Sequence, residues 1–342
     1  MNGRLRGEAA LTEQRRGSGV MRLGTTRDGG APVGPGGQPT TGGESLSEHA
    51  PATLDIVLAS GAATLLSSCP VTRDCTGAVL AAVSASGARV VEAEQHLDPD
   101  AGRLFQRVRA DISWVAGGAL EFEARLVECA RRAGVGPRVR RAERRQRVAI
   151  FVSKYDHCLY DLLLRQQAGE LDCEISVVVS NHPDLGRVAR EFGVDYEVVP
   201  KNAQNKREAE AREGALLDDC GTDLVVLARY MQVLSDEFVT SRPNRVINIH
   251  HSFLPAFIGA KPYHQAAERG VKLVGATAHY ATAHLDEGPI IEQDVVRCTH
   301  KDTVADLVRK GRDLEKQVLA RAVRWHLDHR VVVHGNHTIV FD

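Results

Sequence analysis

The feature that most constrains the fold is the alternation of apolar runs with amphipathic segments in the second half of the chain. The runs are rich in Val, Ile and Leu and cover residues 147–153, 174–180, 196–200, 223–228, 246–251 and 273–280. The segments at 156–168, 184–192 and 206–219 have helical periodicity. Strands that are apolar along their length are buried on both faces, so the pattern predicts an α/β domain with a mostly parallel, doubly wound sheet. A long helix over 303–329 and a terminal hairpin turning at 334–336 complete it.

A different pattern precedes this domain. Two short β-type runs at 53–60 and 63–69 lead into an Ala/Val/Leu helix that opens at Thr76 and Gly77 and stops at Gly87. Strands at 88–97 and 103–112 and a helix at about 117–133 follow. This order predicts a ferredoxin-like α+β domain with helices on one face of its sheet.

The boundaries follow from composition. Residues 1–50 are rich in Gly, Arg, Thr and Pro, which predicts a disordered extension, and Met21 leaves open a later start. We place the small domain at 51–136, an arginine-rich linker at 137–146 and the larger domain at 147–342. The alternative for the arginine run is an RNA-binding stripe, although no aromatic residues are interleaved there.

Composition also limits the partners. The net charge of -1 gives no general affinity for phosphate polymers, so we expect no nucleic-acid partner. There is no apolar stretch of the roughly 20 residues that a membrane helix needs and no signal peptide, which predicts a cytoplasmic protein. The seven cysteines are scattered without CxxC spacing, so we expect reduced thiols rather than disulfides or a thiolate metal site.

Polar and titratable residues are most closely spaced in the segments "VINIHHSFLPAF" and "GATAHYATAHLDEGPII". Because side chains alternate along a strand, Asn248 and His250 should point to the same face, with His251 and Ser252 beyond the strand end. Asp286 precedes a Glu-Gly-Pro turn that would hold its carboxylate near the sheet edge. An amide, an imidazole and a carboxylate suit acyl chemistry without a covalent intermediate, because the first two can stabilise an oxyanion while the third positions water.

Other interpretations of these residues stay open. The Asn-His pair can be a satisfied buried pair, and the aspartate can be a turn residue. A metal site is the alternative for the histidines, but they lack helical HxxxH spacing, so we expect no metal. Ser252 and Cys158 lack the partner base or the elbow motif of a nucleophile.

The segments "INIHHSFLPAFIGAKPYHQA", "GVKLVGATAHYATAHLDEGPIIEQDV" and "LVVLARYMQVLS" resemble the formyltetrahydrofolate deformylases, a group of the formyl-transferring folate enzymes. The resemblance implies hydrolysis of 10-formyltetrahydrofolate without a cofactor, which supplies formate for purine biosynthesis and balances one-carbon folate pools. It implies that Asn248, His250 and Asp286 are catalytic. It also implies a pterin pocket, which would be lined by Met231, Gln232, Val233, Leu234, Ala281, Thr282, Ala283 and Leu285.

The first domain resembles an ACT domain, a fold that commonly binds amino acids at paired interfaces. This implies an amino-acid effector near Asp74 and Gly77 and a homo-oligomer. The larger domain also resembles glycinamide-ribotide formyltransferases, which carry a Gly-rich, phosphate-binding turn after their first strand. Here "FVSKYDHCLYDLL" has no glycine at that place, which favours hydrolysis. The alternatives are a formyltransferase with an amine acceptor and an amino-acid-sensing protein with an inactive second domain.

Overall fold

The computed structural model describes residues 51–72, 75–255 and 262–342. The extension predicted to be disordered, 1–50, and the predicted effector residue Asp74 lie outside these ranges. Among the described residues, no helix is long and apolar enough to cross a membrane.

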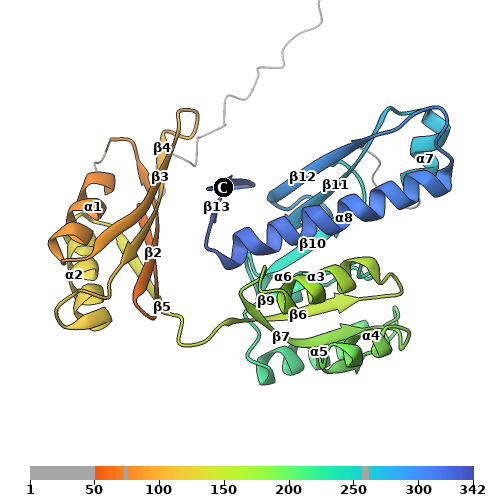
Figure 1. Cartoon of the computed structure of the whole chain (residues 1–342), viewed down its shortest axis with the longest axis horizontal. Helices are drawn as coiled ribbons and strands as arrows, with labels where there is room; N and C mark the ends of the chain where they lie inside the picture. Colours follow the sequence, from red (N-terminus) through yellow and green to blue (C-terminus); the bar gives the residue numbers. More distant parts are fainter. Residues whose placement is uncertain (1–50, 73–74, 256–261) are drawn as a thin grey trace, which may run out of the picture. The chain divides into compact units, whose positions relative to one another are not determined.

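A five-stranded sheet forms the first half of the described chain. Its elements are β1 (Thr53–Ala59), β2 (Ala62–Pro70), α1 (Cys75–Ala85), β3 (Arg89–Asp98), β4 (Arg103–Asp111), α2 (Gly118–Arg132) and β5 (Gly136–Arg141). The strand order is β3-β4-β2-β1-β5, with only β1 and β5 parallel. Both helices lie on one face (Figure 1), where Val83, Phe122 and Leu126 pack on Ile56 and Val108. The predicted ferredoxin-like α+β arrangement, with helices on one face of the sheet, is therefore confirmed for this part of the chain.

Strand β5 differs from the expectation, because its residues include the first part of the predicted linker at 137–146. Val139 packs against the domain core, and Arg138 donates to both carboxylate oxygens of Asp55 at 2.6 and 2.9 Å. The arginines of this edge strand are exposed, so its sequence resembles a solvated linker. The assignment of separate domains remains a prediction.

A seven-stranded sheet forms the second half. It contains β6 (Gln146–Val152), α3 (His157–Gln167), β7 (Cys173–Ser180), α4 (Gly186–Glu191), β8 (Tyr196–Val198), α5 (Lys206–Asp219), β9 (Leu224–Leu227), α6 (Asp236–Thr240), β10 (Val246–His250), α7 (Pro262–Arg269), β11 (Leu273–Tyr280), β12 (Ile290–Arg297), α8 (Val304–Leu327), and the hairpin β13 (Val331–His334) and β14 (His337–Val340). The order is β12-β11-β10-β9-β6-β7-β8. Strands β6 to β10 are parallel, whereas β11 and β12 are antiparallel additions. The mostly parallel, doubly wound sheet is confirmed.

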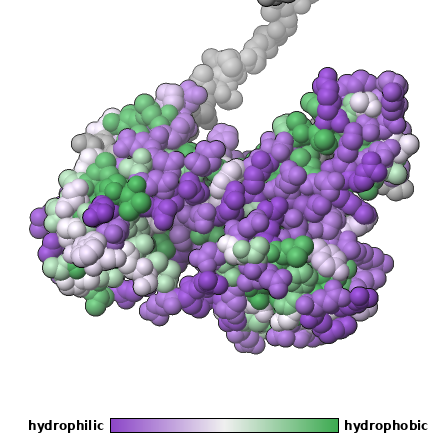
Figure 2. Space-filling view, in the orientation of Figure 1, coloured by the Kyte–Doolittle hydropathy of each residue, from purple (hydrophilic) through white to green (hydrophobic). Residues whose placement is uncertain are grey.

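Two apolar layers cover this sheet. On one face, residues of α3, α4 and α8 pack on the strands, including Leu159, Val188 and Val318. On the other face, α5 and α6 contribute Leu217 and Phe238. Helix α8 runs along β10, β11 and β12 (Figure 1) and begins with a capping box between Thr303 and Asp306. Hydrophilic residues dominate the surface over α8, whereas apolar residues are more frequent over α1 (Figure 2), which contains no charged residue.

Candidate active site

The site lies where the chain reverses its direction of strand addition. From β6 the chain adds β7 and β8 outward and then returns to the other side of β6 with β9 and β10. Such a switch point leaves a crevice at the carboxyl ends of parallel strands. A cavity of about 600 Å³ lies there, and it is lined by Tyr155 after β6, Arg229 after β9, and Asn248 and His250 of β10.

Asn248 is held by its cross-strand neighbour. Asn248 of β10 pairs with His279 of β11, and Nδ2 of Asn248 lies 3.2 Å from Nε2 of His279. Nδ1 of His279 donates to the backbone oxygen of Tyr280 at 3.0 Å, so in the neutral ring Nε2 is the acceptor. The Asn248 amide must then direct its NH₂ group at His279. One of its two hydrogens is used there, and the other is free for a ligand.

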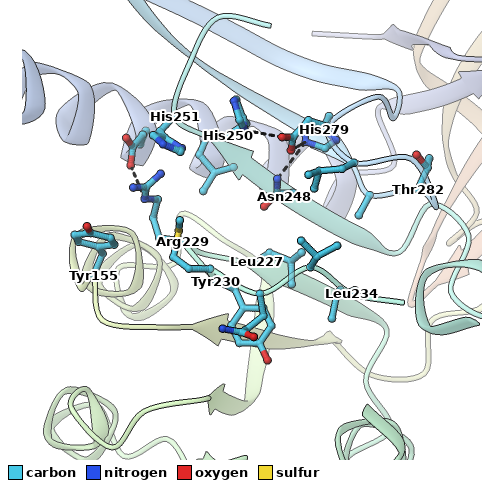
Figure 3. A pocket seen from close by; sticks show the side chains of 18 of the residues that line it. Tyr155, Leu227, Arg229, Tyr230, Leu234, Asn248, His250, His251, His279 and Thr282 are labelled. Carbon is cyan, nitrogen blue, oxygen red and sulfur yellow. Dashed lines mark hydrogen bonds and ion pairs between the residues drawn. The ribbon is translucent and has the colours of Figure 1, made fainter. Parts of the chain in front are cut away.

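His250 and Asp286 face each other across the cavity rim. Nδ1 of His250 lies 3.2 Å from Oδ2 of Asp286, and Nε2 of His279 lies 3.6 Å from Oδ1 of the same carboxylate (Figure 3). Burial acts to raise the pKa of Asp286, but the neighbouring His250 and His279 rings outweigh it and hold that pKa well below its usual range. Asp286 is therefore ionised at neutral pH. Nε2 of His250 is buried and has no hydrogen-bond partner among the described residues, which marks it as a position for a ligand or water.

The loop after β11 fixes the place of Asp286. Asp286 has a φ of 58°, in the left-handed region that aspartate tolerates better than most residues. Two residues later, Gly288 passes so close to the backbone oxygen of Tyr280 that a side chain at this position would collide with it. Pro289 accepts a hydrogen bond from the Tyr280 amide at 2.9 Å. The turn therefore returns the chain to β11 and leaves the carboxylate at the sheet edge.

A second loop forms an apolar part of the cavity. The Met231 amide donates to Oγ of Ser153 at 3.0 Å, and the Ser235 amide donates to the Glu210 carboxylate at 3.2 and 3.3 Å. The loop is thus tied at both ends, while Met231 and Val233 remain 53% and 57% exposed. Leu285, from the loop after β11, is 60% exposed and lines the same cavity. Exposed apolar side chains around a cavity are typical of a binding site for a planar organic group.

Comparisons with known proteins identify the family of this chain. A family model described as formyl transferase matches residues 146–323. A formyltetrahydrofolate deformylase from Synechocystis is 49% identical over 279 residues, which cover 82% of this chain and 98% of that protein. This chain belongs to the formyltetrahydrofolate deformylase family. The crystal structure of a deformylase from Pseudomonas syringae aligns with a TM-score of 0.75 at 40% identity, over 87% of this chain and 97% of that one.

The larger domain is also similar to a transferase. A glycinamide ribonucleotide transformylase from Symbiobacterium toebii aligns with a TM-score of 0.55 at 33% identity, over 58% of this chain and 95% of that one. In the present deformylase, Tyr155 follows the first strand of this domain. Its ring lies under two guanidinium groups, with Cζ of Arg229 and Arg312 at 5.0 and 5.4 Å from the ring centroid. This end of the deformylase cavity is therefore lined by cationic and aromatic side chains.

Behind Tyr155, a buried carboxylate joins three elements. Glu315 of α8 is 1% exposed and accepts hydrogen bonds from His157 Nε2 at 2.7 Å and from the Tyr263 hydroxyl at 2.6 Å. Burial acts to raise the pKa of Glu315, but His157 and Arg229 outweigh it and lower it. His157, Cys158 and Glu315 also offer ligand atoms within 4.8 Å of one another, as a metal site would. Burial raises the pKa of the Cys158 thiol, so it is a poor metal ligand and a poor nucleophile.

The residues predicted from the sequence divide between two places. The catalytic candidates Asn248, His250 and Asp286 line the same cavity as the pterin candidates Met231, Gln232, Val233, Leu234, Ala281, Thr282, Ala283 and Leu285. Gly77 lies in α1, in the five-stranded part, and does not line it. Sequence analysis missed His279 as a partner of Asn248, and it missed Arg229 and Glu315 entirely. The signal in the sequence that could have identified His279 is its position near the end of the strand that leads into the loop of Asp286.

Proposed function

We propose that this chain hydrolyses 10-formyltetrahydrofolate to formate and tetrahydrofolate. The observation that carries the proposal is the convergence of Asn248, His250 and Asp286 at the rim of one cavity. Membership of the deformylase family supports the same reaction. The roles of individual residues given below belong to the proposal.

In this mechanism the formyl oxygen is bound by two donors. The free hydrogen on Nδ2 of Asn248 and a proton on Nε2 of His250 both point to the place where negative charge develops when water attacks the formyl carbon. Nδ1 of His250 faces the Asp286 carboxylate, so the proposed role of Nε2 as a donor requires a ring that carries a proton on both nitrogens. Removing one oxyanion donor typically costs about 3–4 kcal/mol of barrier.

Asp286 has a second role, because its carboxylate lines the cavity as well as contacting the two histidines. It orients the attacking water and relays one of its protons toward N10 of the folate. The C–O bond to water forms, the C–N10 bond breaks, and N10 retains the proton. The products are tetrahydrofolate, which is uncharged at N10, and the formate anion. The second proton of the attacking water is released to solvent.

The substrate would place its pterin against the apolar loops. Met231–Leu234 and the stretch from Ala281 to Leu285 supply exposed apolar side chains and backbone groups, and about 600 Å³ is within the range of pockets that hold ligands of drug size. No cofactor is required by this chemistry.

The deciding experiment is formate release from 10-formyltetrahydrofolate with no acceptor amine. A hydrolase turns over fully in this assay, whereas an amine-dependent formyltransferase releases little formate until an acceptor is added. Asn248→Ala should fold normally and lose activity by about a hundred- to a thousandfold. Near-full activity in that variant would reject the assignment of the oxyanion donors.

The five-stranded part belongs to the proposal as a regulatory domain of ACT type, with an amino-acid effector near Gly77 and pairing of domains in a homo-oligomer. A cytoplasmic enzyme with this activity would supply formate for purine biosynthesis and balance the one-carbon folate pools. Formate release measured with each amino acid in turn tests the effector, and sedimentation of the purified chain tests the oligomer.

A further inference from the structure

The end of the cavity opposite the apolar loops carries a buried guanidinium. In Figure 3, Arg229, Tyr155 and His251 lie on one side of His250, while Thr282 and Leu234 lie on the other. Arg229 follows β9 and is 9% exposed, and it lines the cavity. The proposed reaction does not use it.

Arg229 uses little of its hydrogen-bonding capacity. Its Nε lies 3.4 Å from Oε2 of Glu315, an ion-pair contact that lacks the alignment of a hydrogen bond, and this buried Nε has no hydrogen-bond partner in the described part of the chain. A guanidinium has five N–H donors and stays charged, so a largely buried one with an unsatisfied Nε can bind a further anion or water.

Glu315 orients Arg229 without satisfying it. Both carboxylate oxygens already accept short hydrogen bonds, Oε2 from His157 and Oε1 from Tyr263. Stacking on the ring of Tyr155 holds the guanidinium from the other side. The second arginine on that ring, Arg312, is exposed at the cavity and adds positive charge. With one carboxylate against two guanidinium groups, this end of the cavity attracts an anion.

The cationic end of the cavity, which contains Arg229 and Arg312, is adjacent to the reacting centre. His251 connects the two, because its ring centroid lies 5.2 Å from that of His250 and 6.2 Å from that of Tyr263, the residue that donates to Glu315. Burial first, and the charge of Arg229 second, lower the pKa of His251 to about 4, so this ring is neutral and the positive charge resides on the arginines.

We propose that Arg229 forms a subsite for a small carboxylate and that its ligand is the formate produced by hydrolysis. The inference rests on the proposed function, since formate is the anion which that reaction creates beside His250. As the C–N10 bond breaks, the formyl carbon becomes a planar carboxylate, and a guanidinium fork binds this shape through two parallel hydrogen bonds. Formate then moves from the oxyanion donors to Arg229 while tetrahydrofolate still fills the apolar end.

The test is binding of ¹³C-formate, followed by NMR, to the full chain with and without tetrahydrofolate. Formate should bind in both conditions, because the two products occupy opposite ends of the cavity. Arg229→Gln should weaken formate binding by roughly ten- to a hundredfold, the worth of a charge-assisted hydrogen bond, and leave tetrahydrofolate affinity within about twofold. Arg229→Lys, which keeps the charge but loses the fork, should give an intermediate value.

Three controls make the result decisive. Arg187→Gln removes one exposed arginine of α4, outside the cavity, and should leave formate binding unchanged. The double variant Arg229→Gln, Glu315→Gln removes one positive and one negative buried charge, so it controls for misfolding caused by an unpaired Glu315. Its affinity for formate should be weakened as much as that of Arg229→Gln alone. The KM of the full substrate and the KM of a substrate without the glutamate tail should both be unaffected by Arg229→Gln. This result would show that the ligand of Arg229 is formate and not the carboxylate of the tail.

Unchanged formate affinity in Arg229→Gln, or displacement of formate by tetrahydrofolate, would overturn the subsite. The binding measurement needs no turnover, so it is separate from the proposed function. If the chain binds formate at Arg229 but releases none from 10-formyltetrahydrofolate, the proposed function is wrong and the formate site stands. If the chain is active but Arg229→Gln binds formate as the wild type does, the formate site is wrong and the proposed function stands.

Discussion

Nδ1 of His250 lies 3.2 Å from Oδ2 of Asp286, although His250 ends β10 and Asp286 lies in the loop after β11, 36 positions further along the chain. The two nitrogens of the His250 ring therefore have different surroundings. Nδ1 faces the carboxylate, and Nε2 is buried without a hydrogen-bond partner among the described residues. The carboxylate accepts the proton on Nδ1, so Nε2 can donate to an oxyanion only when the ring carries a second proton.

Asp286→Asn tests this relationship. The amide can still accept a hydrogen bond from Nδ1 of His250, but it carries no charge and cannot relay a proton. We expect kcat to fall by about 10²–10⁴-fold, the usual range for a lost acid–base group, with KM for the folate little changed. Steady-state kinetics measure this, with the circular dichroism spectrum as the control for folding. A variant with more than a tenth of the wild-type kcat would contradict the assignment.

His279→Ala tests whether Asn248 is positioned by its neighbour. Without the acceptor at 3.2 Å, the Asn248 amide can rotate away from the oxyanion, so kcat should fall by about ten- to a hundredfold at nearly constant KM. The double variant with Asn248→Ala should be no slower than Asn248→Ala alone, because both changes remove the same interaction. Additive losses in the cycle would show that His279 acts independently of Asn248.

Much of this site could be predicted from the sequence, because its determinants are local. Alternation along a strand places Asn248 and His250 on one face, and the Glu-Gly-Pro turn marks the loop of Asp286. The apolar runs of β6, β7 and β9 likewise identify buried parallel strands.

The parts that were missed depend on pairing between distant segments. The contact of Asn248 with His279 requires the register of β10 on β11, which periodicity does not contain. Glu315 is a charged residue within the buried stripe of α8, and its partners come from α3, α7 and the end of β9. Strands β5 and β12 were missed because they are edge strands with charged residues, and such strands lack an apolar run.

Leu285→Ala tests the apolar end of the cavity. The side chain is largely exposed in the described structure, so its removal should cost little stability, whereas a bound pterin would lose its contact. We expect KM to rise about 5- to 30-fold, equivalent to about 1–2 kcal/mol of apolar contact, with kcat changed less than twofold. Val91→Ala, at an exposed valine of β3, is the matched control for loss of a surface side chain. A KM equal to that of the control would exclude Leu285 from the folate site.

His326→Gln tests the effect of pH on stability. Burial lowers the pKa of His326 from 6.5 to about 3, and its Nδ1 lies at hydrogen-bond distance, 2.8 Å, from the Tyr280 hydroxyl. Between these two values the unfolded chain binds a proton that the folded chain does not, so the free energy of unfolding falls as pH decreases from about 6.5 toward 3. The slope from this residue is at most about 1.4 kcal/mol per pH unit.

Glutamine keeps an acceptor for Tyr280 but takes up no proton in this range. The variant should therefore lose less stability than the wild type between pH 7 and pH 5, as measured by urea unfolding at both values. His251, whose pKa is lowered to about 4, contributes to the same decline in both proteins, so the difference isolates His326. Identical losses in the two proteins would contradict the prediction.

Two helical glycines offer a matched pair for the buried network around Glu315. A methyl group at Gly311 in α8 would collide with the ring and hydroxyl of Tyr263, which donates to Glu315 at 2.6 Å. At Gly214 in α5, the nearest atom to an added methyl is a terminal nitrogen of Arg242 at 3.5 Å, an ordinary contact. Gly214→Ala should therefore raise the free energy of unfolding by about 0.5–1 kcal/mol through helix propensity alone.

Gly311→Ala gains the same propensity but must displace Tyr263 from Glu315. We expect a net loss of about 1–3 kcal/mol in urea unfolding, the usual cost of overpacking a filled core. Because Glu315 orients Arg229, the same variant should also bind ¹³C-formate more weakly, whereas Gly214→Ala should bind it as the wild type does. If both alanine variants were stabilised equally, Tyr263 would be free to move and its hydrogen bond would contribute little to the network. Loss of stability without a change in formate affinity would show that Tyr263 and Arg229 are not coupled through Glu315.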